Sequence, residues 1–313
     1  MKSPWTALCA AGLAAGLFLA PPAAGSQAVQ GADKWTWTAE ELEAVKKLEK
    51  TVTAKNSRFL LERERWKVET FISPRFTAEV AQFMEMAERS FAQIIEGKSA
   101  VPLKPTVLVY ASQQDYEKRF KDGTRGQFKY RWNELGEWEE NHLYTYLRLP
   151  VERDFSSFHW KTLQHEGAHA FLRNLVGKSE VPPWFDEGIA TYFESWDLRT
   201  DAAANQKDRY SRSRYRRHLK DHCLTNPGRF LNLPELMKIR APAWNSDKMG
   251  PEATHNYARA ESVIDYFLAS DETKGIFKRL VESAMAGKGV LVSDDELRTL
   301  EVGWRKHVEN AVK

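Results

Sequence analysis

The stretch LQHEGAHAF at residues 163–171 carries two histidines four positions apart, with a glutamate directly after the first. In an α-helix, positions four apart lie on one face, one turn along the axis, so His165 and His169 can both direct an imidazole at one ion. Zinc favours imidazole nitrogen ligands in this arrangement. Glu166 is turned about 100° around the helix from His165. It is therefore placed to reach a water molecule on the metal rather than the metal itself.

The chemistry that this pattern indicates is metal-assisted hydrolysis. Zinc lowers the pKa of a bound water towards about 7, and a neighbouring carboxylate can accept the proton. The same carboxylate can then pass the proton to a leaving amine. The alternative is that the two histidines have this spacing by chance. The helix is expected to be buried, however, and burying two histidines and a glutamate without partners would cost much free energy. The sequence therefore predicts His165 and His169 as metal ligands and Glu166 as the general base.

A catalytic zinc needs a third protein ligand and one open position. A metzincin pattern would place a glycine and then a third histidine after His169, but those positions hold Leu172 and Leu175. The other solution is a carboxylate on the next helix. The stretch VPPWFDEGIATYFE (181–194) offers Glu187, with 17 residues between it and His169.

Two other acids in this stretch compete with Glu187 for the third ligand position. Glu194 lies two turns further on, roughly 10 Å along the helix axis, so it and Glu187 cannot both bind one ion. Asp186 points to another side of the helix. Glu187 is favoured because the ligand geometry requires a side chain near the start of that helix, and because Gly188 permits close helix packing there.

The motifs HEGAH and PPWFDEGIATYFE together resemble those of the gluzincin (peptidase MA-like) superfamily of zinc metallopeptidases. They are especially similar to secreted bacterial members of uncharacterised function, which share a PxWxxEGxAxYxE motif. The resemblance covers about residues 100–270. It implies that the first helix supplies His165, His169 and the base Glu166, that the second supplies the ligand Glu187, and that each chain binds one Zn²⁺. The spacing between the motifs is one residue shorter than in the aminopeptidase N-like members.

A downstream segment, THNYARAESVIDYF (254–267), resembles the part of such enzymes that holds a tyrosine near the substrate carbonyl. Tyr257 is the candidate, since its phenol could donate a hydrogen bond to the oxyanion of a tetrahedral intermediate. His255 is a rival for this role. The GxMEN motif that binds a substrate amino terminus is absent, so an endopeptidase is expected rather than an aminopeptidase.

The periodicity of apolar residues predicts the elements that must position these side chains. Strands are expected at 65–72, 106–110, 126–132 and 142–149, helices at 77–96, from about Ser156 to Gly177 and from 183 to about 196, and further helices over 200–313. This order favours an α+β fold over a parallel α/β sheet. The resemblance adds a zincin-like arrangement, in which a small mixed sheet packs on the two motif helices. The expected divisions are a signal peptide (1–28), an N-terminal segment (29–75), a zincin core (76–200) and a helical C-terminal subdomain (201–313) that completes the site.

The first 28 residues have the three parts of a secretory signal peptide. Lys2 is followed by an apolar run from Ala7 to Ala20 and then by prolines and small residues, with cleavage expected after Gly25 or Ala28. The run is short for a membrane span, although an uncleaved anchor is the alternative. Cleavage would remove Cys9 and leave Cys223 as the single cysteine, which excludes an intramolecular disulfide. A secreted or periplasmic protein of a bacterial envelope is expected, without stable membrane insertion after cleavage.

The partners expected are peptide or protein substrates, and not nucleic acid. The formal charge is only +3, and the basic stretch 207–222 is interpreted as a solvated helix because charge is balanced elsewhere. One of the strands 142–150 and 126–132 could pair with an extended substrate if it lies at a sheet edge. The alternative from another functional class is a noncatalytic envelope binding protein on a zincin scaffold.

Overall fold

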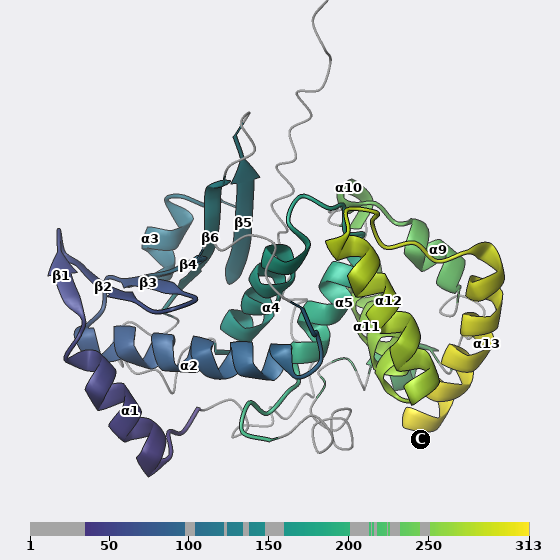
Figure 1. Ribbon diagram of the computed structural model, residues 1–313, viewed down its shortest axis with the longest axis horizontal. Helices are drawn as coiled ribbons and strands as arrows, with labels where there is room; N and C mark the ends of the chain where they lie inside the picture. The colour runs from purple at the N-terminus through teal and green to yellow at the C-terminus, as the bar shows by residue number, and fades with distance from the viewer. Residues whose placement is uncertain are drawn as a thin grey trace, which may run out of the picture. The chain divides into compact units, whose positions relative to one another are not determined.

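The computed structural model describes residues 35–97, 104–121, 124–133, 138–147, 160–200, 213, 215, 218–223, 225, 232–244 and 251–312 (Figure 1). The expected signal peptide, Ser156 and most of the basic stretch 207–222 lie outside these residues. Within the described part of the chain, no helix is both long enough and apolar enough to cross a membrane.

The chain forms two compact units. One comprises residues 1–81 with 103–159, and the other comprises residues 82–102 with 160–313. The first contains the β-sheet, and the second contains the two motif helices. These units do not follow the sequence-based boundaries at 75 and 200, since the second unit continues from residue 160 to 313. Helix α2 (Pro74–Ala92) begins in the first unit and ends in the second.

The first unit is built on a six-stranded mixed sheet with the order β1-β2-β3-β4-β6-β5. The β3–β4 and β4–β6 pairs are parallel and the other pairs are antiparallel. The elements are α1 (Ala39–Glu49), β1 (Thr53–Lys55), β2 (Arg58–Glu62), β3 (Lys67–Thr70), β4 (Thr106–Tyr110), α3 (Gln113–Glu117), β5 (Gly126–Trp132) and β6 (Trp138–Tyr146). The mixed sheet and the many helices confirm an α+β fold.

The buried strands are those that the sequence identifies best. TVLVY forms β4, whose first four residues are buried between two parallel neighbours, as a continuous apolar run requires. The strand expected at 126–132 is β5. The hairpin β1–β2 was not predicted, since β1 is wholly exposed and the segment before residue 58 is polar and helix-prone. Its turn residues Asn56 and Ser57 both have positive φ, which is typical of a two-residue hairpin loop.

The sheet topology decides between the two strands considered for substrate pairing. Strand β6 lies between β4 and β5, so both of its edges are already paired. An extended substrate therefore cannot pair with β6. The suggestion that strand 142–150 serves as the substrate-binding edge is wrong. Among the strands that the structure describes, β5 is an outer one.

The second unit is helical in its described residues. Its elements, after the end of α2, are α4 (Trp160–Val176), α5 (Pro183–Glu194), the π-helix η2 (Leu219–Cys223), α9 (Leu233–Lys238), α10 (Ala241–Trp244), α11 (Pro251–Leu268), α12 (Asp271–Met285) and α13 (Asp294–Ala311). Helix α5 packs against both α4 and α11 (Figure 1). The Phe91 ring of α2 contacts Phe171 of α4 and Phe193 of α5, with ring centroids 5.6 Å and 4.7 Å apart.

Close approach of α5 to α11 depends on Gly188. A Cβ at this position would lie 2.8 Å from the carbonyl oxygen of Ala260 and 2.8 Å from Cγ1 of Ile264. The backbone of α11 cannot shift away from this Cβ without a free-energy cost. Gly188→Ala is therefore expected to lower the free energy of unfolding by about 1–3 kcal/mol. Chemical denaturation of the two proteins measures this difference.

Gly275→Ala is the matched control for this substitution. Gly275 also lies inside a helix, α12, but a Cβ there would meet nothing within 4 Å. This variant should be about 0.5–1 kcal/mol more stable than the wild type, because alanine favours the helix. Equal effects of both substitutions would contradict the tight α5–α11 contact as the cause.

Candidate metal centre

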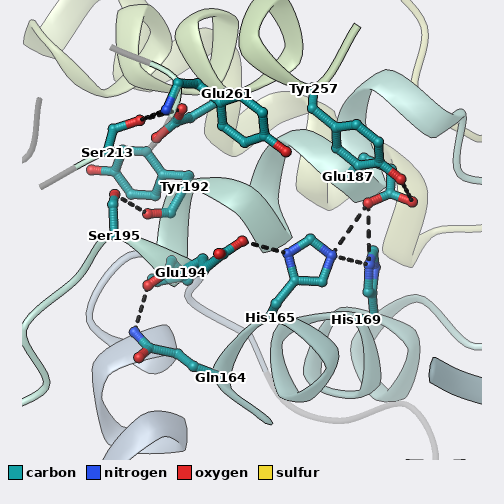
Figure 2. Close-up of polar contacts among 12 residues, drawn as sticks. Gln164, His165, His169, Glu187, Tyr192, Glu194, Ser195, Ser213, Tyr257 and Glu261 are labelled. Atoms are coloured by element: carbon teal, nitrogen blue, oxygen red, sulfur yellow. Dashed lines mark hydrogen bonds and ion pairs between the residues drawn. The ribbon is translucent and has the colours of Figure 1, made fainter. Parts of the chain in front are cut away.

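Helix α4 presents both motif histidines from one buried face. His165 and His169 are 4% and 3% exposed, and their Nε2 atoms are 3.3 Å apart. The helix ends at Val176, and Gly177 follows with a φ of 59°, the left-handed conformation in which glycine commonly terminates a helix. The expected helical spacing of the motif is therefore present, and both imidazoles converge (Figure 2).

Helix α5 brings Glu187 to the same point. Proline at the start of α5 suits the first turn, where no backbone donor is needed. The Glu187 side chain is fully buried, and its Oε2 lies 3.4 Å from Nε2 of His165 and 3.5 Å from Nε2 of His169. Within the described residues, these three side chains form a group that could hold a metal ion.

The separations in this group are suited to metal coordination. Ligand bonds of about 2.1 Å in a tetrahedral site leave pairs of ligand atoms roughly 3.4 Å apart. The three measured separations are 3.3, 3.4 and 3.5 Å. Oε2 of Glu187 is also buried without a well-formed hydrogen bond from the described residues. A metal ion would supply the missing partner, so the residues present fit a three-ligand site.

Asp186 and Glu194, the two acids that compete with Glu187 in the sequence, lie on the outer sides of the two imidazoles. Asp186 Oδ1 lies 2.7 Å from Nδ1 of His169. Glu194 Oε2 lies 3.3 Å from Nδ1 of His165 (Figure 2). Each therefore faces the ring nitrogen that points away from the ligand group. A carboxylate at that nitrogen keeps the proton there and leaves Nε2 free to bind a metal.

The relative direction of α4 and α5 explains this assignment. The later residue of α5, Glu194, meets the earlier histidine, and the earlier residue, Asp186, meets the later histidine, so the two helices run in opposite directions. The amide of Gln164 supports the same register, because its Nε2 donates to the carbonyl oxygen of Phe193 at 2.5 Å.

The carboxylates shift the pKa values of the ligand residues strongly. Burial lowers the pKa of His165, but the adjacent carboxylates of Glu187 and Glu194 outweigh this and raise it to about 9. For His169 burial is again outweighed, here by the charges of Asp186 and Glu187, which raise its pKa well above the usual value. Burial raises the pKa of Glu187, but the charge of His169 and the adjacent imidazole of His165 bring it down to about 2. Protons and a metal ion would therefore compete for this group.

Glu166 is placed next to the ligand group by the helix itself. Its side chain is 1% exposed. It directly follows His165, and its charge contributes to the raised pKa of that histidine. A buried carboxylate beside a metal ligand is suited to accept and return a proton.

The structure also brings Tyr257 to the site, from helix α11. Its hydroxyl donates to Oε1 of Glu187 at 3.4 Å (Figure 2). Its ring packs on Tyr215 and Trp244 at centroid distances of 6.2 Å and 5.7 Å. The rival His255 has a different partner, since its Nδ1 lies 2.7 Å from Nε2 of His218. The contact with Glu187 supports Tyr257 as the candidate.

Two features of the centre were missed by the sequence reasoning. The roles of Asp186 and Glu194 as outer partners were not predicted, although Glu194 lies seven residues after Glu187 and so on the same side of α5. Arg173, four residues after His169, was not considered, although that spacing places it on the ligand face of α4.

Residues 159–287 match a family described as "Protein of unknown function (DUF1570)". This span contains both motif helices and α11, and therefore every residue of the candidate centre. No curated protein and no solved structure matches the chain.

Proposed function

We propose that this protein is a zinc-dependent metallopeptidase of gluzincin type, which hydrolyses peptide bonds. The observation that carries the proposal is the buried group of His165, His169 and Glu187, with ligand atoms 3.3–3.5 Å apart. Glu166 lies in the same helical turn as His165. A purely structural metal site has no use for a base at that position and commonly takes four protein ligands.

The donor set favours zinc over other cations. Calcium and magnesium prefer oxygen ligands, whereas two imidazoles with one carboxylate suit zinc. The outer carboxylates Asp186 and Glu194 support the same choice, because histidine ligands of zinc generally donate their second N–H to a carboxylate or carbonyl. The chain would then hold one Zn²⁺.

The reaction follows from the residues around the ligand group. Zinc would supply Lewis acidity, which polarises a carbonyl and lowers the pKa of water. Glu166 would accept a proton from the attacking water and then donate it to the amine nitrogen of the scissile bond. Asp186 and Glu194 would keep the two imidazoles in the orientation and tautomer in which Nε2 faces the ligand group.

Tyr257 would act on the substrate carbonyl. Its hydroxyl lies 3.4 Å from Oε1 of Glu187, which brings it within reach of an oxyanion formed beside the ligand group. Tyr257→Phe is therefore expected to lower kcat about 10²–10³-fold. Zinc content should not change, since the phenol is not one of the three ligands.

Steady-state kinetics and elemental analysis of the same preparation check this prediction. Tyr266→Phe, on the same helix α11 but with its ring packed on His307, is the matched control and should leave kcat unchanged. An unchanged kcat in Tyr257→Phe would remove Tyr257 from the mechanism and leave the role of Glu166 intact.

The experiment that tests the proposed function uses purified mature protein, supplemented with zinc and then dialysed. About one equivalent of zinc by elemental analysis is expected, together with cleavage of unstructured protein and of internally quenched peptides blocked at both ends. A chelator should stop cleavage and added zinc should restore it. Zinc without cleavage would favour the noncatalytic envelope binding protein, and absence of zinc would overturn the hydrolase.

The setting of this activity follows from the sequence. The signal peptide and the lack of a disulfide partner for Cys223 support a secreted or periplasmic location in a bacterial envelope. Cleavage of doubly blocked peptides would identify an endopeptidase, as the absent GxMEN motif leads one to expect.

A further inference from the structure

Arg173 is a buried cation in the last turn of α4, one turn beyond His169. Only 5% of its surface is exposed. Taking a guanidinium out of water is costly unless anions and acceptors surround it. The contacts of the Arg173 guanidinium therefore indicate the function of its charge.

The guanidinium joins the turn between α4 and α5 to the acid that faces His169. Nη1 donates to the carbonyl oxygens of Ser179 at 2.9 Å and Gly177 at 3.3 Å. Nη2 lies 3.9 Å from Oδ2 of Asp186. The backbone also closes the turn, since the Gly177 N–H donates to the carbonyl oxygen of Arg173 at 2.9 Å.

Asp186 lies between this cation and a metal ligand. Its Oδ2 faces Arg173, and its Oδ1 faces Nδ1 of His169 at 2.7 Å. Asp186 also directly precedes Glu187, so the position of its side chain is coupled to the backbone that carries the third ligand. An unbroken line of contacts thus runs from the α4–α5 turn through Arg173 and Asp186 to His169.

We infer that Arg173 is a positioning residue for the metal centre, which sets metal affinity through Asp186 and through the α4–α5 turn. Its guanidinium lies beside Oδ2 of Asp186 and helps to direct Oδ1 at Nδ1 of His169, which orients that imidazole so that its Nε2 faces the ligand group. Its two hydrogen bonds to the turn hold α5 at the distance from α4 at which Glu187 reaches both histidines. The inference rests on the metal centre of the proposed function and not on hydrolysis.

Metal affinity is the quantity that tests the inference. The zinc dissociation constant of the full mature chain is measured by competition with a chromophoric chelator, and the absorption spectrum of the cobalt-substituted protein reports the ligand geometry. Arg173→Met is expected to weaken zinc binding about 10–100-fold, as loss of an outer partner commonly does. Arg240→Met is the matched control, since Arg240 is exposed and pairs with exposed Glu180. It should bind zinc like the wild type.

A double-mutant cycle separates a role through Asp186 from a general loss of stability. Asp186→Asn alone should also weaken binding about 10–100-fold. If Arg173 acts through Asp186, the double variant should bind zinc almost as tightly as the single variant with the lower affinity. The reason is that the effects of coupled residues on binding free energy do not add. Losses that multiply would contradict the coupling, and wild-type affinity of Arg173→Met would overturn the inference.

A lysine variant and the zinc content of the wild type cover the cases in which Arg173→Met does not fold or the wild type binds no zinc. If Arg173→Met does not fold, as judged by circular dichroism, Arg173→Lys keeps the charge but loses the forked donor, and its affinity should fall measurably. Wild-type affinity of the lysine variant would then overturn the inference. A wild-type protein that binds zinc without cleaving peptides refutes only the proposed function, whereas a wild-type protein that binds no zinc refutes both.

Discussion

Replacing Glu166 by glutamine is expected to lower kcat for peptide hydrolysis about 10²–10⁴-fold while leaving one equivalent of zinc in the protein. Glutamine has the shape of glutamate but cannot accept the proton of the attacking water. The three ligand residues are untouched, so metal affinity should remain close to that of the wild type. Parallel determination of kcat and of zinc content on one preparation separates the two effects.

The control for this variant is Glu180→Gln, which makes the same chemical change at an exposed residue paired with Arg240. It should retain wild-type kcat. If Glu166→Gln cleaved peptides as fast as the wild type, another group would have to serve as the base. If it lost zinc as well as activity, Glu166 would belong to the ligand set and the assignment of roles on α4 would be wrong.

Replacing Glu187 by glutamine is expected to remove the metal. A neutral amide oxygen is a poor ligand for zinc, and the substitution leaves two histidines where three ligands are needed. The zinc dissociation constant should rise by more than the 10–100-fold typical of an outer partner. His169→Ala should have the same consequence. Zinc content after dialysis and chelator competition measure both variants.

Thermal unfolding gives an independent readout of the same loss. A ligand at about 100 times its dissociation constant stabilises a folded protein by about 2.7 kcal/mol. Chelation should therefore lower the Tm of the wild type but leave that of Glu187→Gln unchanged. Glu194→Gln is the matched control, because it alters an acid on the same helix that faces Nδ1 of His165 and should retain zinc with weaker affinity. One equivalent of tightly bound zinc in Glu187→Gln would mean a different ligand set.

These variants also distinguish the three acids of α5, which are alike in chemistry and close in sequence. Glu187 should be needed for any binding, whereas Asp186 and Glu194 should tune it. The distinction rests on which ring nitrogen each acid faces, Nε2 for Glu187 and Nδ1 for the other two.

The sequence by itself determined the parts of this protein that depend on local periodicity. Four-residue spacing on a helix places His165 and His169 on one face and sets Glu166 beside them, whatever surrounds the helix. An apolar run such as TVLVY forms a buried strand for the same local reason. The glycine next to Glu187 indicated a close helix contact, and Gly188 does meet α11 without room for a Cβ.

Only the tertiary structure decided how these parts meet. The hairpin β1–β2 was not evident, because its exposed strand buries no apolar face that could show a periodicity. The interior position of β6 could not be predicted either, since strand order depends on pairings between distant segments.

The same limit applies to the metal centre. Helix periodicity gives the direction of each side chain around its own axis, but the offset between two helices is set by their packing. The antiparallel register of α4 and α5 directs Asp186 and Glu194 to the outer nitrogens and brings Arg173 towards Asp186. The approach of α11 brings Tyr257 to Glu187. Chemically similar carboxylates thus acquire different roles through positions that no single helix encodes.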